Sequence, residues 1–549
     1  MDTCKTNSWK YLQEAIDAEI KSLEESILTL KQRRNALAPI SSLPIEVIST
    51  IFSILRVPVA QSPLTLTALS ENPGNLPWFR ISHVCHHWRE IALDQPLFWS
   101  HLRLTNFSSA GVGEMLARAK MVPIYLEAMV PNHWNGAQFS AFQKEIRMHA
   151  SHISHLDISA DFSRFSNVVK GLVSPAPILE YLSLVCTGFP NSVLPSEVCI
   201  PDTLFDGTTP RLSCLKLRKC DISWRSPLLK GLKCLEMHYP FWRPSLSNWL
   251  DALDAMSQLQ ILILHEASPE ALPLPGYNIE RTIALPFLSV LVFSAFARDY
   301  GFALDHLVLP ALTRLCLTVR SDLRDGSDVQ EILPCISQHA RGFQNTQRMV
   351  VRNDGIHTNI LAWFDVSSPE EITFLDEMPS APLEFSYTSH YWSSKTHEEV
   401  FDAAMAALPL ENLVSLTSQT RRTYFSKEVW LHHAQRWSLL QRVCLSPSAV
   451  RGFTEMLMED NEGRGNPLLP SFTTLVLVDE LDARRTLRLC DALMNRVEQG
   501  VPLEELDLQA CLATGHAVHL LSEIVVDVHG PVSTLQQSLL HVKMKLVVS

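Results

Sequence analysis

Apolar residues in the segment 43–102 follow the spacing of two amphipathic helices. In the first half, gaps of four, one, three, one and three place them on one helical face: Leu43, Val47, Ile48, Ile51, Phe52 and Leu55. Pro44 is expected at the first helical position, where its missing N–H breaks no hydrogen bond, and Ser41 or Ser42 can cap the helix. The second half repeats the pattern and is expected to end before Pro96. Its apolar positions, with the cluster that follows, are Ile81, Val84, Cys85, Trp88, Ile91 and Ala92, then Leu97, Phe98, Trp99 and Leu102.

In order and spacing this segment resembles an F-box. The match consists of an L-P-x-E helix, a V-C-x-x-W-R helix and a closing D-x-P-x-hydrophobic-W run. The resemblance implies binding to a Skp-type adaptor and, through it, to a cullin ubiquitin ligase. The residues that it assigns to the adaptor contact or to the motif's own core are Leu43, Pro44, Ile45, Val47, Ile48, Ile51, Phe52, Leu55, Val84, Cys85, Trp88, Ile91, Pro96, Leu97 and Trp99.

One departure from the F-box pattern is an inserted, proline-rich loop at 56–77, which leaves the geometry of the middle helix open. A helical hairpin that buries its own core is the alternative to a docking module. Small domains, however, bury only about 60% of their unfolded surface. Because this short segment carries so many large apolar groups, we expect part of its surface to be covered by a partner.

The residues before the F-box, 1–40, predict one long amphipathic helix with coiled-coil character. Its apolar positions alternate by four and three over about three heptads, with Arg34 at the one polar position: Ile16, Ile20, Leu23, Ile27, Leu30 and Leu37. Two roles remain open for this stripe. It either supports self-association through residues 9–37 or docks onto the neighbouring F-box.

Beyond the F-box (41–103), the chain from 104 to 549 is built on a loose L-x-x-L-x-L repeat. Copies centred on 156, 182, 215, 235, 262, 291 and 315 recur every 20 to 33 residues, and further copies follow at 416, 443, 475 and 506. Helix-like stretches separate them. This pattern resembles an irregular leucine-rich repeat solenoid, an α/β fold whose strands form a curved parallel sheet. A doubly wound sheet is the alternative, and copies that all run in one direction favour the solenoid.

Two features of the repeats are irregular. Between 338 and 408 the register is poor, although units at 346–351 and 383–387 are conceivable. The asparagine or cysteine that usually follows the third leucine is mostly missing, and only Cys220 and Cys511 lie near that position. The turns elsewhere must therefore be stabilised by other groups.

Residues that flank the buried leucines of each strand are expected on the concave face, because side chains alternate along a strand. Their chemistry changes from charged to aliphatic along the array, which suits a protein target, although the face could also be covered by loops or simply solvated. The candidate target-binding residues are Lys216, Arg218, Glu236, His238, Ile263, His265, Val290 and Val292.

Composition narrows the function classes. The 549 residues are 46% hydrophobic with a net charge of −12, so no general attraction to nucleic acid is expected. Twelve scattered cysteines without a C-x-x-C pair indicate reduced thiols in the cytoplasm or nucleus. Neither a signal peptide nor an apolar run long enough for a membrane span is recognisable.

Motifs that would carry catalysis or hold a cofactor are missing from the sequence. Gly111-Val112-Gly113 lacks the third glycine of a phosphate-binding loop, and neither H-E-x-x-H nor G-x-S-x-G occurs. The adjacent pairs His86-His87 and His432-His433 are expected to point about 100° apart on a helix, so no metal is predicted. The sequence thus predicts a non-enzymatic substrate receptor of a Skp–cullin–F-box ligase. The alternative is an interaction scaffold outside the ligase, built on the repeats and the coiled coil.

Overall fold

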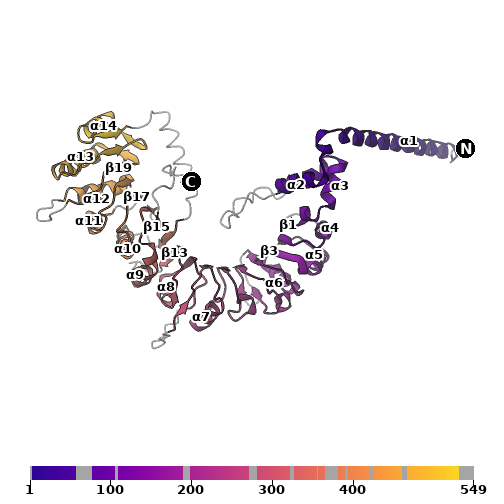
Figure 1. Ribbon diagram of the computed structural model, residues 1–549, viewed down its shortest axis with the longest axis horizontal. Coiled ribbons are helices and arrows are strands. Elements are labelled where there is room, and N and C mark those ends of the chain that lie inside the picture. The colour runs from indigo at the N-terminus through magenta and orange to yellow at the C-terminus, as the bar shows by residue number, and fades with distance from the viewer. Residues whose placement is uncertain are drawn as a thin grey trace. The chain divides into compact units, whose positions relative to one another are not determined.

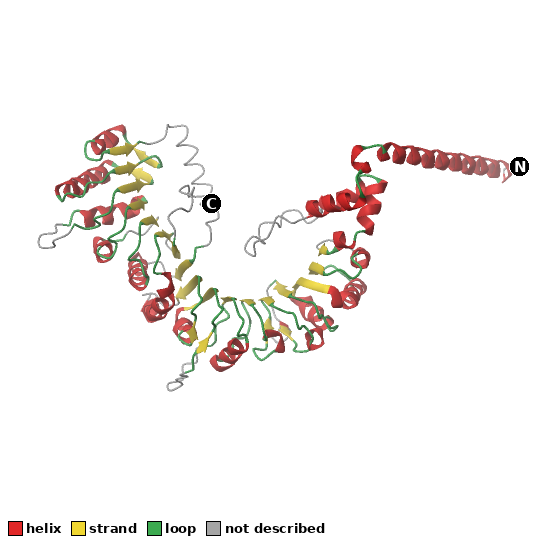
Figure 2. Cartoon of the chain, in the orientation of Figure 1, coloured by secondary structure: helices red, strands yellow, loops and turns green. Residues whose placement is uncertain are grey.

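The computed structural model is a mixed α/β fold, in which a helical N-terminal region is followed by a long, mostly parallel sheet of 17 strands that alternate with helices (Figures 1 and 2). This confirms the predicted fold class. The structure describes residues 3–56, 77–104, 109–130, 132–188, 198–270, 281–321, 327–354, 357–364, 381–389, 394–420, 425–459 and 467–530. The chain folds as two compact units. One consists of residues 1–214 and 219–223, and the other consists of residues 215–218 and 224–549.

The first unit begins with helices. They are α1 (Thr3–Ala36), η1 (Pro39–Ser42), α2 (Ile45–Arg56), η2 (Pro77–His83), α3 (His86–Asp94) and η3 (Pro96–Trp99). Most of the predicted insertion, residues 57–76, lies outside the described part of the chain. Pro44 lies one position before α2, and its carbonyl accepts hydrogen bonds from the N–H groups of Val47 and Ile48.

The expected serine cap of α2 is wrong. Ser41 Oγ donates to the carbonyl of Asn35 at 2.9 Å, and Ser42 Oγ donates to that of Pro39 at 2.7 Å. Both hydroxyls therefore close the turn after α1 rather than accept from the first N–H groups of α2. The proline that begins η1 explains the difference, because it places both serines in a 3₁₀ turn of their own.

Strands and helices then alternate in the first unit. They are β1 (His101–Leu104), α4 (Ser109–Arg118), β2 (Ile124–Val130), α5 (Gly136–His149), η4 (Ala150–His152), β3 (Ile153–Asp161), α6 (Phe162–Gly171), β4 (Tyr181–Thr187), β5 (Cys199–Ile200), η6 (Leu204–Gly207) and β7 (Asp221–Ile222). Strands β1 to β4 pair in parallel, each with the next. The sheet therefore starts at His101, well before the first repeat copy that the sequence suggested.

The second unit continues the alternation up to a longer connection. Its elements are β6 (Cys214–Arg218), η7 (Pro227–Leu229), β8 (Cys234–His238), α7 (Leu246–Ala255), β9 (Ile261–His265), β10 (Ile283–Ala284), β11 (Val290–Phe296), α8 (Ala297–Leu304), β12 (Leu307–Val308), β13 (Arg314–Ser321), α9 (Ser327–Ala340) and η8 (Arg341–Phe343). The template leucines are buried and their neighbours are partly exposed, for example along β8 and β9. This is the alternation that the repeat pattern predicts.

The strand order reverses between β13 and β17. The strands concerned are β14 (Arg348–Asn353), β15 (His357–Trp363), β16 (Leu383–Ser389) and β17 (Ser415–Thr420), with α10 (Ser394–Ala407) before β17. Strand β13 pairs in parallel with β16, β16 and β14 both pair antiparallel with β15, and β14 pairs in parallel with β17. Both conceivable units of this region are thus strands that run parallel to β13 and β17, but they occupy the sheet in swapped order, with the unexpected antiparallel strand β15 between them.

A hairpin signal explains the reversal. Asp354-Gly355 stands between two apolar runs, and Asp-Gly is a strong short-range signal for a tight hairpin. A connection this short forces β15 to run antiparallel to β14, since a parallel partner needs a longer crossover.

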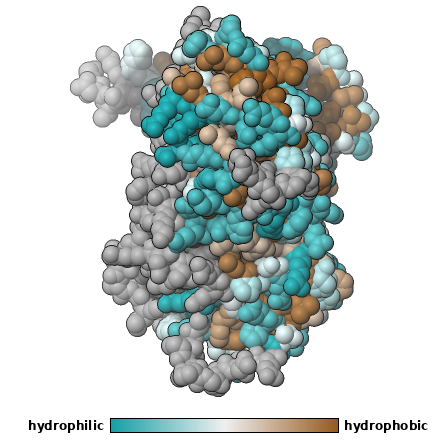
Figure 3. All heavy atoms as spheres, turned by 90° about the vertical axis from the view of Figure 1, so that its left-hand side faces the viewer, coloured by the Kyte–Doolittle hydropathy of each residue, from teal (hydrophilic) through white to brown (hydrophobic). Residues whose placement is uncertain are grey.

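The last elements return to a simple repeat. They are α11 (Lys427–Ala434), β18 (Arg442–Leu445), α12 (Pro447–Leu457), β19 (Thr474–Leu477), β20 (Asp479–Leu481), α13 (Ala483–Glu498), β21 (Glu505–Asp507), β22 (Cys511–Ala513), α14 (Gly515–Ser522) and β23 (Asp527–His529). In Figure 3 hydrophobic side chains gather near the top of the view, the level at which α13 and α14 lie in Figure 1. Leu487 and Met494 of α13 are exposed, as are Leu512 of β22 and Val526 just before β23.

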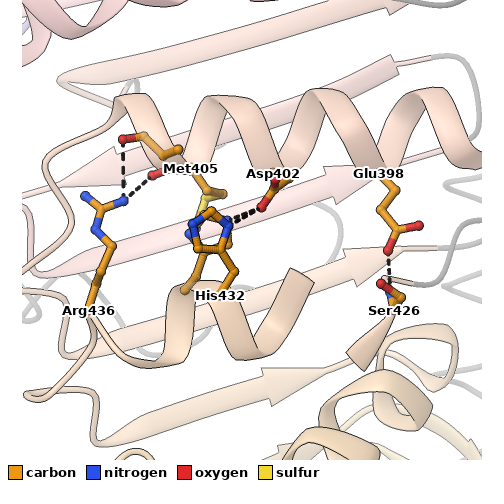
Figure 4. Close-up of polar contacts among 8 residues, drawn as sticks. Glu398, Asp402, Met405, Ser426, His432 and Arg436 are labelled. Atoms are coloured by element: carbon orange, nitrogen blue, oxygen red, sulfur yellow. Dashed lines mark hydrogen bonds and ion pairs between the residues drawn. The ribbon is translucent and has the colours of Figure 1, made fainter. Parts of the chain in front are cut away.

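Arginine side chains stabilise the turns that lead into β17 and β19. Arg436, just after α11, donates to the carbonyl of Met405 at 2.9 Å (Figure 4). It also donates to the carbonyl of Leu408 at 2.9 Å. Arg496 near the end of α13 donates to three carbonyls of the turn before β19. In the first unit Cys220 lies near the position of the repeat's usual asparagine or cysteine, and its Sγ donates to the carbonyl of Leu184 at 3.5 Å.

Candidate functional site

Four side chains of the predicted F-box form its own core. Ile48, Phe52, Ile91 and Trp99 are almost completely buried, with 2% of Phe52 exposed. The ring of Phe52 lies 5.2 Å from that of Trp88, and Trp99 Nε1 donates to the carbonyl of Ala92 at 2.8 Å. These contacts hold α2, α3 and η3 together, so these four side chains are structural rather than available to a partner.

A second group of F-box side chains remains at the surface. We call it the F-box apolar surface, and its members are Leu43, Ile45, Val47, Ile54, Val84 and Leu97. On α2, Val47 is 43% and Ile54 is 66% exposed, and their seven-residue separation puts them on the same helical face. Ile54 is absent from the predicted adaptor set, although its spacing from Val47 could have identified it.

The remaining predicted adaptor residues lie between these two groups. Ile51, Cys85, Trp88 and Pro96 are half-buried, and Pro44 is exposed. Cys85 also has a local role, because its Sγ accepts from the Trp88 N–H at the start of α3. The side chain of Leu55 lies outside the described part of the chain.

The predicted target-binding residues lie on the face of the second unit's sheet that alternates with the buried leucines, which we call the open face. Lys216 Nζ lies 2.9 Å from Glu236 Oε1, the same oxygen that contacts His238 Nε2 at 2.5 Å. The rings of His238 and His265 stack at 4.5 Å. A continuous polar network therefore runs over β6, β8 and β9, and Arg218 remains exposed beside it.

Electrostatics fix the charges within this network. Burial would raise the pKa of Glu236, but hydrogen bonds from His238 and Lys216 outweigh it and lower that pKa to about 2. Burial, reinforced by the positive charge of His238, lowers the pKa of His265 to about 4. At neutral pH the network thus contains an ionised Glu236 and a neutral His265.

An aliphatic region adjoins the polar network on the open face. Ile263 of β9 lies opposite Val292 of β11, and Val290 lies opposite Ile261. All four side chains are half-buried. The predicted change from charged to aliphatic chemistry is therefore present on the described strands.

Sequence reasoning missed an aromatic stack in the first unit. The rings of His101, Tyr125, His155 and Tyr181 stack in that order across β1 to β4, with successive centroids 5.3, 5.3 and 5.9 Å apart. Each of the four directly precedes a buried leucine in the sequence, which is the signal that could have revealed the stack. Burial lowers the pKa of His155 and raises the pKa of Tyr125.

The histidine pair in α11 has a geometry that the sequence did not suggest. Asp402 Oδ1 in α10 accepts from His432 Nδ1 at 3.0 Å and from His433 Nε2 at 2.8 Å, and the two rings stack (Figure 4). The expectation that adjacent histidines diverge is therefore wrong here, because both rings turn towards the neighbouring helix. Their donor atoms and Asp402 Oδ1 lie within 4.8 Å of one another. The two hydrogen bonds explain this arrangement as a link between α10 and α11.

The buried side chain of His433 should make the free energy of unfolding depend on pH. Only 1% of it is exposed, and burial lowers its pKa to about 4, whereas an unfolded histidine titrates near 6.5. The unfolded chain therefore binds more protons between these values, and the free energy of unfolding falls as the pH decreases from 6.5 to 4. Between pH 7 and pH 5, the free energy of unfolding of the His433→Asn variant should therefore decrease by about 2 kcal/mol less than that of the unchanged chain. Urea unfolding at the two pH values measures this difference. Replacement of the exposed His519 by asparagine is the control, and this variant should show the same decrease as the unchanged chain.

Comparison with known proteins identifies one segment. A model of the F-box-like family matches residues 40–105, which include α2, α3 and η3. No curated protein matches the chain. Among the described residues, no helix is both long and apolar enough to cross a membrane.

Proposed function

We propose that this chain is a substrate-recognition subunit of a Skp–cullin–F-box ubiquitin ligase. The single observation that carries the proposal is an F-box-like segment whose structure leaves a set of large apolar side chains at the surface after its own core is filled. Exposed apolar side chains of this size on a small helical module are typical of a protein interaction site. Proteins with an F-box are typically non-catalytic subunits, which agrees with the absence of catalytic motifs in the sequence.

The role we assign to the chain is positional. The F-box apolar surface would bind the Skp-type adaptor, and through it a cullin, while the open face would hold a target protein. Keeping a target lysine near the ubiquitin-charged enzyme replaces a bimolecular encounter with an effectively unimolecular one. No side chain of this protein needs to take part in the bond-forming step.

The open face supports a target with mixed chemistry. Lys216, Glu236 and His238 are already engaged with one another, so a ligand group there competes with existing ion pairs. Arg218, in contrast, is exposed on β6, and Ile263 and Val292 present apolar surface on β9 and β11, beyond β8. These features favour an extended segment that crosses the strands with an acidic group at one end and apolar residues at the other.

Reconstitution of the full chain with a Skp-type adaptor and a cullin tests the proposal. We expect a stable ternary complex that transfers ubiquitin to a bound protein when the charged enzyme is added. Adaptor binding without cullin would instead support the scaffold outside the ligase. Failure to bind any Skp-type adaptor would overturn the proposal.

A further inference from the structure

The apolar stripe of α1 is uncovered along its length. Ile16, Ile20, Leu23, Ile27 and Leu30 are between 48% and 64% exposed, and Trp9, one heptad before Ile16, is 72% exposed. Docking of this stripe onto the F-box is therefore not what the described residues show. A regular seam of this kind is stable in water only when another helix covers it.

The heptad positions of the seam follow from this spacing. Gln13, Ile20, Ile27 and Arg34 take position a, and Trp9, Ile16, Leu23, Leu30 and Leu37 take position d. Charged residues flank the seam: Asp17, Glu24 and Lys31 at position e, and Glu19 and Arg33 at position g. All five are exposed.

A parallel pair of these helices is disfavoured by charge. Position a would then face position a, so that Arg34 would lie against Arg34 of the second copy inside the seam. Position g would face the e position of the next heptad, which puts Glu19 opposite Glu24 twice per dimer. Like charges at these positions are destabilising.

An antiparallel pair satisfies the same charges. When Leu23 lies opposite Ile27 of the second copy, Ile20 lies opposite Leu30 and Arg34 lies opposite Ile16. The e positions then pair Asp17 with Lys31, and the g positions pair Glu19 with Arg33. Each of these attractive pairs occurs twice, against a single Glu24–Glu24 contact at the centre.

We infer that two copies of this chain associate through α1 as an antiparallel coiled coil. Both the apolar seam and the flanking charges support a second copy as the occupant, because the sequence complements itself in this orientation. The two helix C-termini, which lead into the F-boxes, would lie at opposite ends of the coil, roughly 35 Å apart at 1.5 Å per residue. The inference does not depend on the proposed ligase role, since it concerns only α1.

Charge variants of the full chain test the orientation. In an antiparallel dimer, D17K/E19K places lysines opposite Lys31 and Arg33, and K31E/R33E places acids opposite Asp17 and Glu19. We expect each variant to dimerise at least about tenfold more weakly than the unchanged chain in sedimentation equilibrium, and an equimolar mixture of the two to regain dimerisation. E14K/E25K, with both changes on exposed positions away from the seam, is the matched control and should leave the dissociation constant unchanged.

Three outcomes would overturn the inference. A chain that stays monomeric at all accessible concentrations has no such coil. Tighter dimerisation of D17K/E19K would indicate the parallel arrangement, in which the lysine introduced by E19K meets Glu24 of the second copy. Unchanged dimerisation of L23D/I27D would show that the copies associate through a different surface.

Discussion

Replacement of Val47 by glutamate together with Ile54 by lysine is expected to weaken binding of the full chain to a Skp-type adaptor by at least about a hundredfold. Each large apolar side chain that is buried at an interface contributes about 1.5–3 kcal/mol, and about 1.4 kcal/mol corresponds to a factor of ten. Both side chains are exposed in the free protein, so the change removes partner contacts and no internal packing. Isothermal titration calorimetry with the purified adaptor measures the effect.

The design of this variant preserves the helix. Glutamate near the beginning of α2 and lysine near its end both agree with the helix dipole, and both are good helix formers. The thermal unfolding temperature should therefore stay within a few degrees of the original value. A loss of adaptor binding accompanied by unfolding would count against the assignment of these side chains.

Two further variants separate surface from core in the F-box. S49E/S53K carries the same charges at polar positions of α2 that lie about 100° or more around the helix from Val47 and Ile54, and it should bind the adaptor normally. Phe52→Ala should show the opposite pattern, with a loss of about 3–5 kcal/mol of stability, because the buried ring packs against Trp88 and Phe98. Equal adaptor affinity of the V47E/I54K variant and the S49E/S53K control would contradict the adaptor assignment.

Arg496→Met is expected to lower the free energy of unfolding by about 3–5 kcal/mol. The side chain is 1% exposed, and its guanidinium donates to the carbonyls of Leu468 at 2.9 Å, Leu469 at 3.2 Å and Phe472 at 3.2 Å. Methionine has a similar volume but no donors, so the carbonyls of Leu468 and Phe472 lose the guanidinium, whereas that of Leu469 keeps the N–H of Phe472. An unpaired buried polar group costs about 1–3 kcal/mol.

Local geometry adds to this expected loss. Leu469 adopts a φ of +49°, which a branched side chain rarely does, so the turn depends on the groups that hold it. Burial lowers the pKa of Arg496 to about 10, which leaves it charged at neutral pH and its donors intact. Urea unfolding provides the measurement.

Controls on the same helix distinguish the turn contacts from charge. Arg485→Met removes a partly exposed arginine from α13 and should change stability by less than about 1 kcal/mol. Arg496→Lys keeps a positive charge but lacks the fork that reaches several carbonyls at once, and should recover only part of the loss. Full recovery with lysine would show that charge rather than geometry matters at this position.

The repeat strands were predictable because a period of two residues is a local property of the sequence. Leu235 and Met237, for example, are buried as the L-x-x-L-x-L template requires, and Glu236 between them is on the open face. The network of Glu236 with Lys216 was not predictable, because it joins two strands whose register the template does not state. The aromatic stack was missed for a different reason, because His101 and Tyr125 lie on strands that precede the first recognised copy of the template.

In the F-box, the sequence could not predict which apolar side chains are buried and which are exposed. Its motif positions were recognisable by spacing, but spacing could not separate Phe52 from Val47, because both belong to the same apolar stripe of α2. Only the packing of α3 and η3 against one side of that stripe decides which side chain remains exposed. The histidines of α11 illustrate the same point, since Asp402 on another helix sets their orientation.

The swapped order of β14 and β16 has a consequence for how the chain acquires its structure. In a simple solenoid each new unit is added to one that is already complete, so ordering can spread from neighbour to neighbour. Here the edge of β13 can pair only with β16, and β16 is synthesised after α9, β14 and β15. Closing such a long loop costs entropy before any contact repays it. We therefore expect this stretch to mature late and as a block, and we expect a nascent chain halted before Leu383 to expose an unpaired strand to chaperones.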